Sequence, residues 1–107
     1  MKTTQKRSDE LKLGDIVHVH GARMRLAEVI VGEHNAESLA KSSIVYTHAV
    51  KDGPKAIERY LDRELTLRSF RSEFVGNVSD YPHSIPASWL KNWTIQGNKY
   101  AMWSVEI

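Results

Sequence analysis

The chain has 107 residues, the length of one ordinary domain, and 15 Lys and Arg against 13 Asp and Glu give a formal net charge of +2. Apolar residues make up 41% and charged residues 26%, a globular composition, and the lack of cysteine excludes disulfide scaffolds, thiolate zinc sites and thiol catalysis. No apolar run approaches the ~20 residues that a membrane span needs, so a soluble, cytoplasmic protein is predicted.

Residues 1–10 are polar and charged, and they are predicted to form a flexible lead-in without a signal peptide, which leaves 11–107 as one β-rich domain. Two strands are predicted next, at 16–20 and 23–31, because both segments are rich in β-branched and long apolar residues. Gly21-Ala22 between them is predicted as a two-residue turn of type II′, which prefers Gly at its first central position.

This turn sorts the predicted hairpin into two faces of opposite character. It places His20 opposite Arg23, and directly opposed residues lie on the same face of a sheet. The apolar face contains Val17, Val19, Met24 and Leu26. The basic face contains His18, His20, Arg23 and Arg25. Such complete sorting of two strands supports the register.

The middle of the chain combines one helix with two further strands. Segment 32–43 is polar and predicts a loop with one helical turn around 36–40, followed by a strand at 44–50. Asp52-Gly53-Pro54 is a helix-start signal. The apolar residues that follow at helical spacing are Ile57, Tyr60, Leu61 and Leu65. They predict a short amphipathic helix that lies on the sheet, and 66–75 predicts the next strand.

The C-terminal part predicts a loop at 76–86, one helical turn at 87–90 and a hairpin of 93–96 with 100–107. A three-residue loop at 97–99 is favoured over a two-residue turn because it gathers the apolar residues on one face. These residues are Trp93, Ile95, Ala101, Trp103, Val105 and Ile107. These strands and the one amphipathic helix predict a mainly β, α+β fold: a small bent antiparallel sheet or a partly open barrel of the SH3-like or OB-like kind.

The basic face is the first candidate for a working surface. Arginines at this spacing can bind phosphates or carboxylates, and the four basic residues have no acid among them. Glu28, further along the second strand, weakens the case slightly. The alternative is an ordinary solvated face, since every surface hairpin needs one. Tyr81 and Trp89 are added as aromatic anchors for a partner, whereas Trp93 and Trp103 are predicted to pack in the core.

The His18-Val19-His20 segment is a weaker candidate for metal binding. Two histidines at this spacing can share a metal, with His48 or Glu28 completing the ligands, and the pattern superficially resembles the HxH motif of cupins. It departs from that motif in the glycine and acid spacing, and the arginines opposite would repel a cation. No metal or other cofactor is therefore assigned.

No catalytic motif was found in the sequence. A nucleophile with a base, a GxSxG elbow, a phosphate-binding loop and carboxylate pairs near His are all missing, and Asp80-Tyr81-Pro82-His83 has the composition of a common loop. The chain is therefore predicted not to be an enzyme.

The segments 14–26, 93–98 and 103–106 together resemble a family of small uncharacterised proteins encoded by bacteriophages and prophages. The resemblance covers both ends of the chain and implies no residue roles. It implies a context: small non-structural phage proteins often act by binding host or phage macromolecules, here in the host cytoplasm.

Three functions follow as hypotheses. The first is a non-catalytic modulator or inhibitor that binds a protein of the host or of a defence system. The alternative is a nucleic-acid-binding barrel that uses Arg23 and Arg25 together with the basic residues of the lead-in, Lys2, Lys6 and Arg7. A second alternative is a metal-dependent small-molecule module. The protein is expected to be a monomer or a homodimer without membrane contact.

Overall fold

A computed structural model describes residues 2–42, 51–78 and 92–107 of the chain. These residues form an α+β structure with six strands, two α-helices and one 3-10 turn. In chain order the elements are β1 (Thr3–Arg7), η1 (Ser8–Glu10), β2 (Ile16–Val19), β3 (Ala22–Val31), α1 (Glu33–Ser42), α3 (Pro54–Leu65), β4 (Arg68–Asn77), β5 (Thr94–Gly97) and β6 (Met102–Glu106). Neither described helix has the length and apolar composition needed to cross a lipid bilayer.

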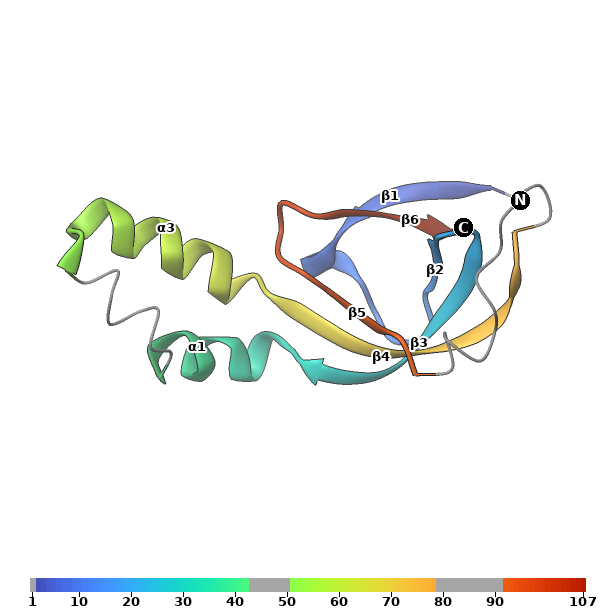
Figure 1. The fold of residues 1–107 in the computed structure, drawn as a ribbon, viewed down its shortest axis with the longest axis horizontal. Coiled ribbons are helices and arrows are strands. Elements are labelled where there is room, and N and C mark those ends of the chain that lie inside the picture. Colours follow the sequence, from blue (N-terminus) through green and yellow to red (C-terminus); the bar gives the residue numbers. More distant parts are fainter. Residues whose placement is uncertain (1, 43–50, 79–91) are drawn as a thin grey trace.

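The strands form one open antiparallel sheet in the order β1-β6-β2-β3-β4-β5. The sheet curves strongly, so that β1 and β6 face β4 and β5 across its hollow side (Figure 1). The predicted fold class, a small bent antiparallel sheet in an α+β protein, is confirmed. Within the described residues, the strand β1 and the full helix α1 were not predicted.

The turn between β2 and β3 is His20-Gly21, so the predicted Gly21-Ala22 turn is wrong. Both residues have positive φ, 49° and 80°, the signs that a type I′ turn requires. The register therefore moves by two residues, and His18 lies opposite Arg23. A shift of two keeps every side chain on its face, because side chains alternate with a period of two. The apolar face is buried as predicted, with Val17, Val19, Met24 and Leu26 in the core.

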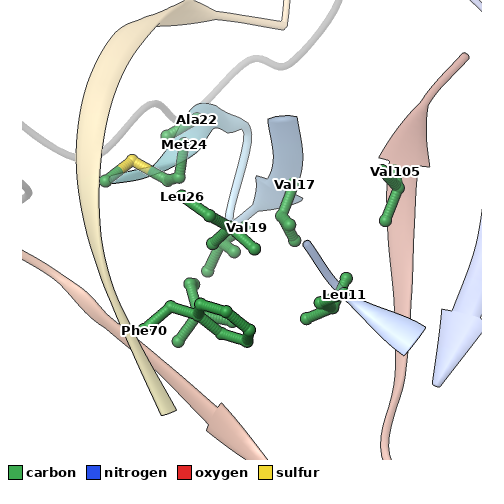
Figure 2. Packing of buried hydrophobic residues seen from close by; sticks show 9 residues of the cluster. Leu11, Val17, Val19, Ala22, Met24, Leu26, Phe70 and Val105 are labelled. Atoms are coloured by element: carbon green, nitrogen blue, oxygen red, sulfur yellow. The ribbon is translucent and has the colours of Figure 1, made fainter. Parts of the chain in front are cut away.

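The core fills the hollow side of the curved sheet (Figure 2). Its buried residues are Leu11, Val17, Val19, Ala22, Met24, Leu26, Phe70, Ile95 and Val105. Trp93 and Trp103 pack against this cluster and are partly buried, so their predicted core role is confirmed. Burial of this apolar surface is the main contribution to the stability of the sheet.

The predicted C-terminal hairpin is wrong, because its two strands do not pair with each other. β5 pairs with β4, whereas β6 lies between β1 and β2. Ile95 and Val105 nevertheless reach the same core, since the chain turns at residues 98–101, here called the corner. Ile107, expected on the same face, is 85% exposed. The apolar pattern predicts which side of a strand is buried, but it does not determine which strand pairs with it.

The N-terminal residues also depart from the prediction of a flexible lead-in at 1–10. Thr3–Arg7 forms β1, which pairs along β6. η1 then places Ser8 in a buried position, where its Oγ accepts a hydrogen bond from Trp103 Nε1 at 2.7 Å. β1 escapes detection because an edge strand is held by backbone hydrogen bonds and can carry polar side chains on both faces.

The two α-helices form a separate projection, here called the arm. α3 begins at Pro54 as predicted, but it packs against α1 and extends beyond the ends of β3 and β4 instead of lying on the sheet (Figure 1). α1 is a full helix where the sequence predicted a loop with a single turn. Ala36 and Ala40 of α1 and Tyr60 of α3 are buried in the arm. With the arm, the molecule measures 49 × 24 × 24 Å.

Several sequence predictions lie outside the described residues. They are the strand at 44–50, the helical turn at 87–90, most of the loop at 76–86, and the candidates His48, Tyr81 and Trp89.

Candidate functional site

The basic face of the β2–β3 hairpin receives an acid from the C-terminal strand. Because β6 lies next to β2, Glu106 reaches both His18 and Arg23. Arg23 donates to both carboxylate oxygens, from Nε to Oε1 at 2.6 Å and from Nη2 to Oε2 at 3.1 Å, and His18 Nε2 lies 2.8 Å from Oε1. The hydrogen bonds from Arg23, followed by that with His18, lower the pKa of Glu106 from its ordinary 4.5 to about 2. Glu106 is thus a bound counterion whose side chain is only 14% exposed.

The second arginine of the basic face is also paired. Arg25 Nη2 lies 3.5 Å from Glu73 Oε2 on the neighbouring strand β4. Glu73 contacts Arg71 at 3.4 Å as well, and Arg71 donates to Glu28 at 3.1 Å. Charges of opposite sign therefore alternate across β3 and β4, and each exposed pair contributes little to stability. The expectation of a basic surface without acids is wrong, because its acids come from other strands.

His20 stands apart from these ion pairs. It is exposed at the turn, and its ring makes an edge contact with Trp93 at 6.3 Å between centroids. His18 is held by Glu106 and Glu28 by Arg71, so the metal-ligand set proposed from the sequence is not assembled by these residues. Among residues 2–42, 51–78 and 92–107, no three His, Asp or Glu side chains lie close enough to hold a metal ion.

A pocket of about 350 Å³ lies where the arm meets the corner, and we call it the α3 pocket. Its lining consists of Ala56, Arg59 and Arg63 from α3 and Tyr100 from the corner. Arg59 and Arg63 are one helical turn apart and therefore lie on the same face of α3. Tyr100 is 66% exposed, which is unusual for so large an aromatic side chain.

Tyr100 is held in place by a group of polar contacts, here called the arm–corner contact. Asp62 of α3 accepts hydrogen bonds from Tyr100 Oη at 2.7 Å and from Lys99 Nζ at 2.6 Å. The Lys99 backbone N–H also donates to Thr66 Oγ1 at 3.2 Å. Hydrogen bonds from Lys99 and then Tyr100 lower the pKa of Asp62, and the bond to Asp62 raises the pKa of Tyr100. The contact thus fixes the corner against α3 and closes one side of the pocket.

The charge of the α3 pocket is not compensated within the described residues. The guanidinium groups of Arg59 and Arg63 make no hydrogen bond or ion pair there, and neither does the ammonium group of Lys55, one turn earlier on α3. Both carboxylate oxygens of Asp62, which directly precedes Arg63 on the helix, are taken by Lys99 and Tyr100. The three side chains Lys55, Arg59 and Arg63 are called the arm cations below.

A second hollow of about 370 Å³ lies at the base of the arm. Its apolar lining comes from Leu11, Leu13, Val29 and Phe70. Its charged lining has both signs, with Asp9 and Glu33 beside Lys12 and Arg68. Because these charges offset one another, the hollow favours neither an anionic nor a cationic ligand.

The sequence places Arg59 and Arg63 correctly on the outer face of the predicted helix but assigns them no role. The spacing of Lys55, Arg59 and Arg63 at intervals of four residues was the available signal. Tyr100 could not be added to them, because the prediction paired residues 100–107 with 93–96 and placed the helix on the sheet. The α3 pocket depends on the contacts of Asp62 with Lys99 and Tyr100, which are 37 and 38 residues away in the chain.

No family model, curated protein or solved structure matches this chain.

Proposed function

We propose that this chain is a non-catalytic binding protein that docks on a partner protein through the arm. The observation that carries the proposal is the α3 pocket, where two arginines of the arm, which make no ion pair among the described residues, lie beside the exposed Tyr100 of the corner. Arginine and tyrosine are enriched among the few residues that dominate protein interfaces. The resemblance to small phage and prophage proteins supports the role of a modulator or inhibitor of a host or defence-system complex.

The nucleic-acid alternative receives less support from the same geometry. It depended on Arg23 and Arg25 together with Lys2, Lys6 and Arg7. The cationic groups of Arg23 and Arg25 already have carboxylate partners in Glu106 and Glu73. A phosphate backbone would have to compete with these internal pairs. The metal-dependent alternative required ligands that the described residues do not bring together.

The proposal is tested by quantitative affinity capture from bacterial lysate with three forms of the protein. These are the wild type, the double reversal Arg59→Glu with Arg63→Glu, and the control Lys2→Glu with Lys12→Glu. Both double variants change the charge equally, and Lys2 and Lys12 are exposed residues outside the arm. We expect a stoichiometric protein partner with the wild type and the control, and its loss with the arm variant. Equal capture by all three forms would overturn the proposal.

A further inference from the structure

We infer that the α3 pocket binds an acidic segment of the partner protein, with one carboxylate bridging Arg59 and Arg63 and a neighbouring apolar side chain lying on Tyr100 and Ala56. This inference rests on the proposed function and specifies the chemistry of the partner. It follows from the spacing of the two arginines, from the hydrogen bonds that hold Asp62 within the protein, and from the short length of helix that the arm cations cover.

The spacing of the arginines suits a single carboxylate. Side chains at i and i+4 of a helix have Cβ atoms about 5–6 Å apart, so Arg59 and Arg63 can direct their guanidinium groups to one point. A carboxylate offers two oxygens to such donors and forms short, charge-assisted hydrogen bonds. Like charges at this spacing repel each other, and a bound anion would remove that repulsion.

The protein's own acids do not supply this anion within the described residues. Asp62 lies on the same helix, but its Oδ1 binds Lys99 and its Oδ2 binds Tyr100. Glu58 and Glu64 are direct neighbours of the arginines in sequence and make no ion pair with them. An anion from outside would therefore meet two unoccupied guanidinium groups.

Tyr100 supplies the apolar part of the pocket. Its hydroxyl is held by Asp62, so the ring has a fixed place beside α3 while 66% of the residue stays exposed. Lys99 Nζ lies 5.4 Å from the centre of this ring. Ala56 extends the apolar lining. A volume of about 350 Å³ accommodates side chains of a peptide rather than a whole folded element.

The limited extent of positive charge favours a protein segment over a nucleic acid. The arm cations span about 12 Å of helix, from Lys55 to Arg63. Strong binding of a nucleic-acid backbone commonly neutralises about 6–10 phosphates along an extended basic surface. On the sheet, Arg23, Arg25 and Arg71 are each paired with a glutamate, so the arm cations are not continued there. A compact acidic segment matches this small patch of positive charge.

The test is an NMR titration of the full chain with a defined acidic peptide, acetyl-Leu-Glu-Glu-Leu-Glu-Glu-Leu-amide. The Arg Nε–Hε signals and the tyrosine ring signals report binding at the α3 pocket. We expect saturable shifts at Arg59, Arg63 and Tyr100, and none at Arg25 or Arg71. The peptide with Gln in place of Glu should produce no saturable shift.

The double variant Arg59→Ala with Arg63→Ala should weaken peptide binding about tenfold or more, the effect of losing a charge-assisted hydrogen bond. Arg63→Lys, which keeps the charge but loses the planar fork, should weaken it less. The amide spectrum of each variant shows whether the fold is retained. If a variant does not fold, the wild-type shifts and the Gln peptide still decide the question.

Two results would overturn the inference. One is the absence of saturable shifts with the acidic peptide; the other is tighter binding of a 12-nucleotide oligothymidylate at the same signals. The capture experiment separates this failure from that of the proposed function. If the peptide does not bind but Arg59→Glu with Arg63→Glu still loses the protein partner, the inference fails and the proposed function stands. If that variant retains the partner, the proposed function fails whatever the peptide does.

Discussion

The arginines of the sheet and those of the arm differ in whether they are paired with an acid. On the sheet, Arg23 lies against Glu106 and Arg25 against Glu73, so each arginine joins one strand to its neighbour. On the arm, Arg59 and Arg63 have no such partner among the described residues. A cationic surface is therefore identified by the positions of the acids as much as by its own residues.

The two regions also differ in how they are packed. The sheet surrounds a continuous apolar cluster that includes nine buried residues of the described part of the chain, so its strands depend on one another. The arm buries Ala36, Ala40 and Tyr60 and is joined to the corner by the polar arm–corner contact. Among the described residues, these two small side chains and one aromatic ring bury far less apolar surface than the core does. Local opening should therefore require less free energy in the arm than in the sheet.

The largest expected effect is on the core of the sheet. Met24 is completely buried, so Met24→Ala should lower the free energy of unfolding by about 2–5 kcal/mol. Met102, 54% exposed on β6, is the matched control, and Met102→Ala should change this free energy by less than about 0.5 kcal/mol. Urea denaturation measures both. Similar losses for the two variants would contradict the location of the core.

The next effect concerns the acid that joins β6 to the hairpin. Because the pKa of folded Glu106 is about 2 and its ordinary value is 4.5, ionised Glu106 stabilises the fold above pH 4.5. This stabilisation is lost as the pH falls from 4.5 through 2. At pH 7 the free energy of unfolding of the wild type should exceed that of Glu106→Gln by about 1–2 kcal/mol, a value reduced because the side chain is partly exposed. This difference in the free energy of unfolding should vanish at low pH.

The matched control for this prediction is Glu37→Gln on α1. Glu37 also has a lowered pKa, because it accepts a hydrogen bond from Lys41, but both side chains are 65% exposed. Removing this pair should change the stability less than removing Glu106, since solvent screens exposed pairs. Urea denaturation at several pH values tests both variants. An equal pH dependence for the two would show that the sheet and the arm do not differ in this respect.

A smaller effect is expected at the arm–corner contact. Asp62→Asn removes the carboxylate that raises the pKa of Tyr100, first through its hydrogen bond and then through its charge, so this pKa should fall back toward the ordinary 10.0. An NMR pH titration of tyrosine labelled at the ring carbon next to oxygen measures the change. Amide hydrogen exchange should also become faster in α3 and stay unchanged in β2 and β3. Glu58→Gln on the same helix should leave both readings unaltered, and a change there would count against the specific role of Asp62.

The smallest effect on stability is expected at the α3 pocket. Arg59→Ala and Arg63→Ala remove side chains without a bound partner among the described residues, so each should change the free energy of unfolding by less than about 0.5 kcal/mol. Arg23→Ala should cost more, because it leaves Glu106 without its bidentate partner. Thermal or urea unfolding of the three variants tests this order. The reverse order would mean that the arm arginines are structural.

The sequence predicts well which face of each strand is buried, and poorly which strands pair with each other. Val17 and Met24 were placed in the core because apolar and polar residues alternate there, and a two-residue error in register leaves that alternation intact. The turn was missed because His20 adopts a positive φ that is uncommon outside glycine. β6 was paired wrongly, since Val105 would be buried equally well beside β5 or between β1 and β2.

The candidate site was predicted less well than the fold, for the same reason. His18, Arg23 and Arg25 were correctly placed on one face, but Glu106 is 83 residues from Arg23 and reaches it only through the strand order. The apolar stripe of α3 could equally face a sheet or another helix, so its contact with α1 was not predictable. Tyr100 acquires its place beside Arg63 only when the corner meets that helix. Hydrophobic periodicity predicts which face of an element is buried, but not which distant element packs against that face.

The register of β3 and β4 has a consequence for how this protein can diversify. The two strands are paired up to Val31 and Ser69, at the base of the arm, so a short turn at that point would connect them without changing the strand order. Residues 32–67 are, in this sense, an insertion at the end of a hairpin. An exchange of this segment could alter what the protein recognises while the packing of the sheet is preserved. The sheet would then serve as a constant scaffold, and the arm as the part that evolution or an engineer can replace.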